Sequence, residues 1–172
     1  SNLLAQPAPL TVDFDAFFQE HWERVCRTVF NIVGDWDEAE DLALEAFLRL
    51  YRRPPGDHSN LAGWVYRVAV NLGFNALRDR KRRLRYETEA GEISLTGEAD
   101  TDTAQAAERR PERRRVRMVL AAMKTRSAQQ LILRHSGLTY AELAVALEIA
   151  PASVGALLAR AEAEFEKLYQ QE

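Results

Sequence analysis

Residues 61–85 constrain the fold most, because LAGWVYRVAVNLGFNALRDRKRRLR predicts one long helix with two different faces. Apolar side chains recur at helical spacing along one face: Leu61, Trp64, Val65, Val68, Ala69, Leu72 and Ala76. Amide and guanidinium side chains recur at similar spacing along another: Arg67, Asn71, Asn75, Arg78 and Arg82. Such a helix buries its first face against neighbouring helices and leaves the second for polar partners.

The end of this helix carries a dense positive charge. Six basic residues lie within residues 78–85, with Asp79 as the only acid: Arg78, Arg80, Lys81, Arg82, Arg83 and Arg85. A basic run taken alone is as well explained by a solvated helix end that complements the helix dipole. The polar face that leads into the cluster favours nucleic acid, since amides and guanidinium groups suit base edges and phosphates.

Composition indicates an all-α protein without a redox or metal centre. The chain has 172 residues, of which 47% are hydrophobic and only 8 are Gly and 6 are Pro, and no long strand-like run occurs. A single cysteine, Cys26, excludes an internal disulfide and lies among apolar neighbours, so we expect a buried structural thiol. The scattered histidines show no ligand spacing, so neither metal nor cofactor is expected. No signal peptide or bilayer-spanning run is visible, which predicts a cytoplasmic protein.

The chain divides into two small helical domains joined by a flexible acidic linker. Residues 10–85 predict a three-helix bundle, whose first helix ends at Gly34 and whose second begins near residues 35–41. Residues 86–110 are rich in acids, Thr, Ala and Gly, which is typical of a flexible linker or a simple spacer. Residues 111–172 predict a second module that begins at Pro111, with a helix capped by Ser127 and ending at Gly137. Within it, residues 139–161 predict a helix-turn-helix, which any helical hairpin could resemble.

Three segments resemble the extracytoplasmic-function sigma factors of bacterial RNA polymerase. EAEDLALEAFLRLY (38–51) and GWVYRVAVNLGFNALRDRKRR (63–83) are similar to segments of that family's region two. GLTYAELAVALEIAPASVGALLARA (137–161) is similar to its region four. Their order is also the family's order, so the resemblance covers nearly the whole chain. It implies a non-enzymatic transcription-initiation factor, with no catalytic residue, that helps to melt the minus-ten promoter element.

The resemblance also implies a role for each surface. Core polymerase would bind through its largest-subunit clamp helices to Glu38, Asp41, Glu45 and Arg49, and through its second-largest-subunit flap to region four. A loop would hold a base flipped from the minus-ten element, through Arg53, Asp57, His58, Ser59 and Asn60. Minus-ten DNA would contact Arg67, Asn71, Asn75, Arg78, Arg80, Lys81, Arg82 and Arg83, and Tyr66 could stack on a base, whereas Trp64 belongs to the core. Minus-thirty-five DNA would contact Ser153, Ala156 and Arg160. The acidic linker would imitate RNA charge near the polymerase active site, and an anti-sigma factor is a possible further partner.

Departures from the family pattern concentrate in the second module. Gly155, Ala156 and Leu157 stand where the recognition helix usually carries Lys, Ser and Arg. Glu148 stands at a turn position that is usually Gly, which strains the turn if the turn needs a positive φ. Two alternatives to a sigma factor therefore stay open. One is a sigma-like protein whose second module serves mainly protein contacts, and the other is a stand-alone helix-turn-helix regulator.

Overall fold

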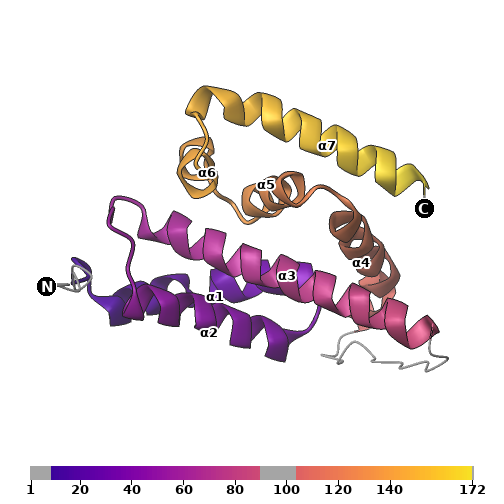
Figure 1. Cartoon of the computed structure of the whole chain (residues 1–172), viewed down its shortest axis with the longest axis horizontal. Helices are drawn as coiled ribbons and strands as arrows, with labels where there is room; N and C mark the ends of the chain where they lie inside the picture. Colours follow the sequence, from indigo (N-terminus) through magenta and orange to yellow (C-terminus); the bar gives the residue numbers. More distant parts are fainter. Residues whose placement is uncertain (1–8, 90–103, 172) are drawn as a thin grey trace, which may run out of the picture.

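The computed structural model describes residues 9–89 and 104–171, with side chains for residues 9–86 and 110–171. Within these residues all the regular structure is helical, without a strand, as the sequence predicts (Figure 1). The elements in order are α1 (Phe14–Val33), α2 (Trp36–Arg52), α3 (Leu61–Glu89), α4 (Ala104–Ala122), α5 (Thr125–His135), α6 (Tyr140–Leu147), the 3₁₀ turn η1 (Pro151–Ser153) and α7 (Val154–Gln171).

The first module is a bundle of α1, α2 and α3, and local capping signals set its helix ends. The Asp13 carboxylate accepts hydrogen bonds from the first backbone N–H groups of α1, and the Asp35 carboxylate accepts one from Glu38 at the start of α2. Gly34 ends α1 as predicted, because it adopts the left-handed conformation at φ 76°. Between these ends, Phe47 and Val65 are fully buried at the centre of the bundle.

Helices extend into both ends of the predicted linker, residues 86–110. Helix α3 continues to Glu89, and α4 begins at Ala104, so Pro111 lies inside α4 instead of starting it. The residues that precede Pro111 are mostly Ala, Gln, Glu and Arg, which favour helix and extend α4 backwards. Residues 90–103, on which the rest of the linker prediction falls, lie outside the described residues.

The second module contains the predicted helix-turn-helix. Thr139 and Glu142 form a capping box at the start of α6. Glu148 ends α6 in the left-handed region at φ 55° and ψ 47°, so the turn does require a positive φ. Ser127 does not cap α5, because the helix already begins at Thr125. Pro151 starts the 3₁₀ turn that leads into α7.

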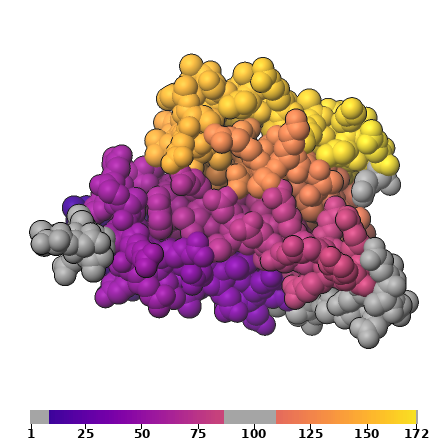
Figure 2. Space-filling view, in the orientation of Figure 1, coloured from indigo at the N-terminus to yellow at the C-terminus, as the bar shows by residue number. Residues whose placement is uncertain are grey.

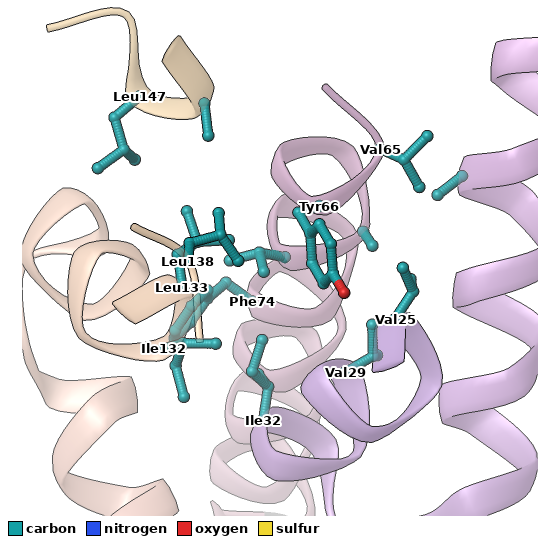
Figure 3. Close-up of a cluster of buried hydrophobic side chains, with 14 of the residues drawn as sticks. Val25, Val29, Ile32, Val65, Tyr66, Phe74, Ile132, Leu133, Leu138 and Leu147 are labelled. Carbon is teal, nitrogen blue, oxygen red and sulfur yellow. The ribbon is translucent and has the colours of Figure 1, made fainter. Parts of the chain in front are cut away.

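The two modules share one continuous hydrophobic core. Helices α5 and α6 pack on α3, and α4 and α5 pack on α1. Figure 3 shows Tyr66 at this junction, with Val25 and Val29 of the first module on one side and Leu133 and Leu138 of the second module on the other. The sequence predicts the two modules separately but not this contact between them.

Cys26 is only 3% exposed, which confirms a buried structural thiol. Burial, together with the nearby Glu40 carboxylate, raises its pKa to about 12, so the sulfur stays protonated and unreactive.

Among the described helices, no single one is long and apolar enough to cross a bilayer, and α6 and the η1–α7 segment reach that threshold only as a pair bent by 109°.

We predict that Gly34→Ala lowers the free energy of unfolding by about 1–2 kcal/mol, because Ala at φ 76° is strained. A Cβ there would also lie 2.7 Å from the guanidinium group of Arg117, which has to move. Gly56→Ala is the matched control, since nothing lies within 4 Å of its Cβ, and we expect a change within about 0.5 kcal/mol. Urea denaturation followed by circular dichroism measures both, and equal effects would show that the Gly34 conformation does not matter.

Candidate nucleic-acid interface

The polar face of α3, defined as Arg67, Asn71, Asn75, Arg78 and Arg82, forms as the sequence predicts. The second module covers part of it. An Arg67 nitrogen lies 2.5 Å from a Glu148 carboxylate oxygen. Beyond Arg67 along the helix, the Asn71 side-chain oxygen accepts a hydrogen bond from the Gln129 amide, and the Arg78 guanidinium group donates one to the Thr125 hydroxyl.

Most of this face is nevertheless open to solvent. Four of its five residues are exposed: Asn71, Asn75, Arg78 and Arg82. Lys81 and Arg83, which flank Arg82, are exposed as well. The Arg82 guanidinium group lies 2.5 Å from the Asp79 carboxylate, in an exposed pair that salt screens strongly. The C-terminal part of α3 thus presents cations to a polyanion, whereas the central part is already in contact with the second module.

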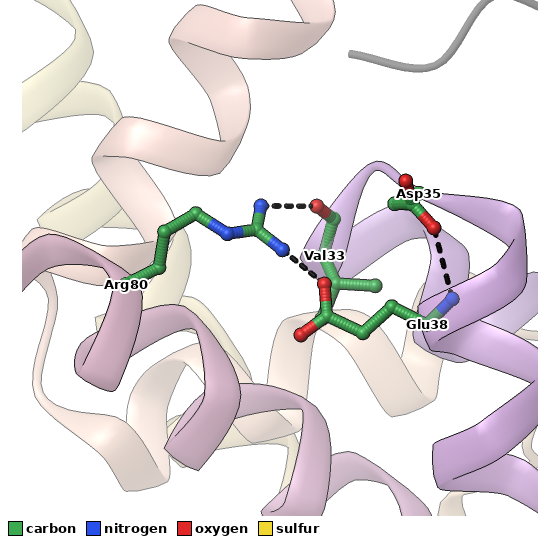
Figure 4. A network of polar contacts seen from close by, with 4 residues as sticks. All are labelled: Val33, Asp35, Glu38 and Arg80. Carbon is green, nitrogen blue, oxygen red and sulfur yellow. Dashed lines mark hydrogen bonds and ion pairs between the residues drawn. The ribbon is translucent and has the colours of Figure 1, made fainter. Parts of the chain in front are cut away.

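Arg80 differs from the other basic residues of α3 because it turns toward the first two helices (Figure 4). One guanidinium nitrogen donates a hydrogen bond of 2.8 Å to the Val33 carbonyl at the end of α1, and another pairs with the Glu38 carboxylate of α2. The network ties together all three helices of the first module. Arg80 and Glu38 therefore have a structural role, while their contacts with DNA and polymerase stay predictions.

The rest of the predicted polymerase surface lies on the outer face of α2. Asp41 is exposed, and the Arg49 Nε donates a hydrogen bond of 2.9 Å to the Glu45 carboxylate one turn earlier. Leu44 and Tyr51 are 43% and 63% exposed beside them. Exposed apolar side chains next to charged ones are suited to binding another protein.

The predicted base-holding loop is shaped by its own side chains. The Asp57 carboxylate accepts a hydrogen bond of 2.8 Å from the Ser59 backbone N–H, and this bond lowers the pKa of Asp57. Asn60 caps α3, because its side-chain oxygen accepts a hydrogen bond of 2.8 Å from the Gly63 N–H. His58 Nδ1 accepts from the Thr11 N–H at 3.4 Å, so the N-terminal segment lies against the loop. Arg53 and Ser59 are exposed there.

The expected minus-thirty-five residues lie together at the start of the last helix. Ser153 in η1 and Ala156 and Arg160 in α7 are all exposed. Only Arg160 among these three carries a charge, and α7 carries the acids Glu162, Glu164 and Glu166 farther along. This surface offers little reach to a base edge and little attraction for phosphate.

Sequence reasoning missed the residues that hold the modules together. The Thr28 hydroxyl lies 2.9 Å from the Ser136 hydroxyl, and the Arg24 guanidinium group donates a hydrogen bond of 2.9 Å to the Ser136 carbonyl. Tyr66 cannot stack on a base as expected, because it is only 2% exposed at this junction, and burial raises its pKa. Among the residues that join the modules, only Glu148 stood out in the sequence, as a non-glycine residue at a turn that needs a positive φ.

A cleft of about 850 Å³ opens between α1 and the second module. Phe30 and Trp36 stack on its wall with ring centroids 4.5 Å apart, and Val116 and Phe165 line it from the opposite module. Arg113 adds a positive charge among the residues around it. An apolar wall with charged residues around it suits an amphipathic helix.

The comparisons with known proteins agree with this geometry. Residues 17–83, which contain most of the first module, match the Sigma-70 region 2 family. The sigma factor RpoE of Bartonella quintana, solved with the anti-sigma factor NepR, superposes on 91% of this chain and 98% of that one, with a TM-score of 0.54 and 18% identity. That likeness shows the fold.

Several curated bacterial sigma factors are also similar to this chain in sequence. The RNA polymerase sigma-H factor of Pseudomonas aeruginosa is 27% identical over 168 residues, or 91% of this chain and 86% of that protein. The sigma factors SigE of Mycolicibacterium smegmatis and SigW of Bacillus subtilis are 33% and 32% identical, over 43% of this chain in each case. Those two matches span only 29% of SigE and 41% of SigW.

The match over residues 17–83 identifies the first module as a Sigma-70 region 2 domain, and the chain is similar to extracytoplasmic-function sigma factors. Members of this family are initiation factors without enzymatic activity.

We predict that Arg80→Ala lowers the free energy of unfolding by about 1–2 kcal/mol, because it removes both the Val33 hydrogen bond and the Glu38 ion pair. The two charged side chains are 34% and 32% exposed, so we expect a coupling of only about 0.5–1 kcal/mol in a double-mutant cycle with Glu38→Gln. Chemical denaturation of the four proteins gives this coupling. Arg82→Ala serves as the exposed control. Zero coupling would show that the Arg80–Glu38 ion pair does not stabilise the fold.

Proposed function

We propose that this protein is an alternative sigma factor that directs bacterial core RNA polymerase to a set of promoters and helps to melt the minus-ten element. The observation that supports it most strongly is the polar and basic side of α3, in a segment that matches sigma-70 region 2. Such a helix combines amides for base edges with cations for phosphates. The protein would act in the cytoplasm, with polymerase and promoter DNA as its partners.

The proposed division of labour follows the modules. Residues 10–85 would bind the clamp helices through the outer face of α2, and the minus-ten strand through α3 and the loop before it. Residues 111–172 would contact the polymerase flap and the minus-thirty-five element. The low charge of the exposed residues at the start of α7 supports a smaller share of promoter recognition for this second module.

An anti-sigma factor is the regulatory partner that we propose for the cleft between α1 and the second module. The solved neighbour from Bartonella quintana is bound to such a protein. The stacked Phe30 and Trp36 rings and the nearby Arg113 would receive an amphipathic helix with apolar and acidic side chains.

Transcription with purified core polymerase from the same organism tests the proposed function. Added to core polymerase on genomic DNA, the chain should produce discrete new transcripts whose upstream sequences share a minus-ten element. The isolated chain should bind those promoters weakly, because its net charge of −3 opposes DNA. Tight, promoter-specific binding without polymerase would instead favour the stand-alone regulator.

We predict that Asn75→Ala lowers run-off transcription from such a promoter by roughly tenfold to a hundredfold, the usual cost of one good base contact. Asn75 is an exposed amide of the α3 polar face, so this change leaves the packed core intact. Arg160→Ala should lower transcription less, because an exposed arginine on α7 offers at most a phosphate contact. If Arg160→Ala abolishes initiation while Asn75→Ala has no effect, the second module is the main reader of the promoter.

A further inference from the structure

We propose that the cleft between α1 and the second module binds a small organic anion that carries an aromatic ring. The cleft volume of about 850 Å³ lies within the range of small-molecule sites in proteins. Figure 2 shows the second module, in orange and gold, packed against the magenta surface of the first. Because helices of both modules line the cleft, it exists only while the modules are packed together.

One wall of the cleft is a flat aromatic surface. Phe30 near the end of α1 and Trp36 at the start of α2 stack with ring centroids 4.5 Å apart and ring planes 9° from parallel. Both residues are only partly buried, so the pair is open to a ligand in the cleft that it lines. A further ring can stack on such a pair or pack edge-on against it. This wall therefore favours a planar aromatic group over an aliphatic chain.

The opposite wall is apolar and comes from three helices of the second module. Val116 of α4, Leu131 of α5 and Phe165 of α7 line it. Each of them packs against the hydrophobic core and is still partly exposed. Apolar surface in contact with water is unfavourable, so a ligand that covers it gains free energy of binding. A ring placed between the two walls would cover apolar surface on both of its faces.

The charges around the cleft favour a negative ligand. Among the described residues that line it, four are arginines and two are glutamates: Arg27, Arg113, Arg117 and Arg134, with Glu112 and Glu162. A Cβ at Gly34 would lie 2.7 Å from the Arg117 guanidinium group, so glycine at that position leaves room for this charge. A guanidinium group can hold a carboxylate or phosphate through two parallel hydrogen bonds. The cleft therefore suits an aromatic ring that carries an anionic group.

Arg113 is the arginine that we expect to hold the anion. It is exposed on α4, at the side of the cleft that it lines. Two other arginines of the lining already have partners within the chain. Arg27 lies 2.5 Å from the Glu23 carboxylate. Arg134 donates a hydrogen bond of 2.8 Å to the Leu138 carbonyl.

The amphipathic helix of an anti-sigma factor would occupy the same cleft, so the small anion and the helix would compete. This competition rests on the proposed function, whereas binding of the small anion does not. A ligand held between the two walls also stabilises the folded chain, because it binds the packed modules and not the unfolded chain. A small aromatic anion would thus release the sigma factor from an anti-sigma factor.

Anilinonaphthalene sulfonate is a suitable probe, because it joins aromatic rings to a negative charge and its fluorescence rises in apolar surroundings. Titrated into the full chain, it should bind saturably at one site and raise the melting temperature measured by circular dichroism. Octanoate, an anion without a ring, should bind at least about tenfold more weakly when it displaces the probe. Binding without saturation, or a melting temperature that falls with added probe, would overturn the proposal.

Substitutions test where the probe binds. Arg113→Gln should weaken its binding by about five- to tenfold. Arg114→Gln makes the same charge change at an exposed neighbour outside the cleft lining, and it should weaken binding by less than about twofold. Val116→Trp should fill the cleft and abolish binding, with circular dichroism to confirm that this variant folds. Equal effects of the two arginine changes would contradict the proposal. A chain that ignores the probe but binds an acidic amphipathic peptide through Arg113 would overturn it too, and would leave the proposed anti-sigma contact standing.

Discussion

The structure depends on the burial of α3 from two directions at once. One side of this helix packs against α1 and α2, and another packs against α5 and α6. Tyr66 sits where the two contacts meet, which explains why a residue in the middle of a proposed DNA-binding helix is almost fully buried. Arg80 then fixes the helix along its length by joining the end of α1 to α2. The polar face of α3 is thus held on a rigid support, and three of its side chains, Arg67, Asn71 and Arg78, also contact the second module.

Much of the fold could be predicted from sequence because its signals are local. Capping residues such as Asp13, Gly34 and Thr139 act within one turn of the chain, and Gly34 ends α1 where expected. The bounds of α3 and α4 were missed because ordinary helix formers continue both helices into the acidic segment, and charge composition does not by itself end a helix. Packing between the modules could not be predicted, since it depends on side chains more than 50 residues apart, such as Asn71 and Gln129.

In the candidate site, too, the local pattern could be predicted from sequence and the contacts between distant residues could not. Helical spacing was enough to put Arg67, Asn71 and Arg78 on one face, because the period of a helix is fixed. Spacing could not show that Arg80 turns inward, since a long side chain can reach a carbonyl of another helix only once that helix is in place. Spacing also could not show which residues of the α3 polar face contact the second module. The departure at Glu148 was visible in the sequence, but its meaning required the position of Arg67.

The charges of the second module are explained better by its contact with α3 than by binding to DNA. A module built mainly to hold duplex DNA needs cations at the start of its recognition helix, and this one presents Ser153 and Ala156 there. A module that also packs against a basic helix benefits from an acid at the contact, and Glu148 supplies one. Weak attraction for DNA and complementarity to α3 both follow from the same shift toward neutral and acidic residues.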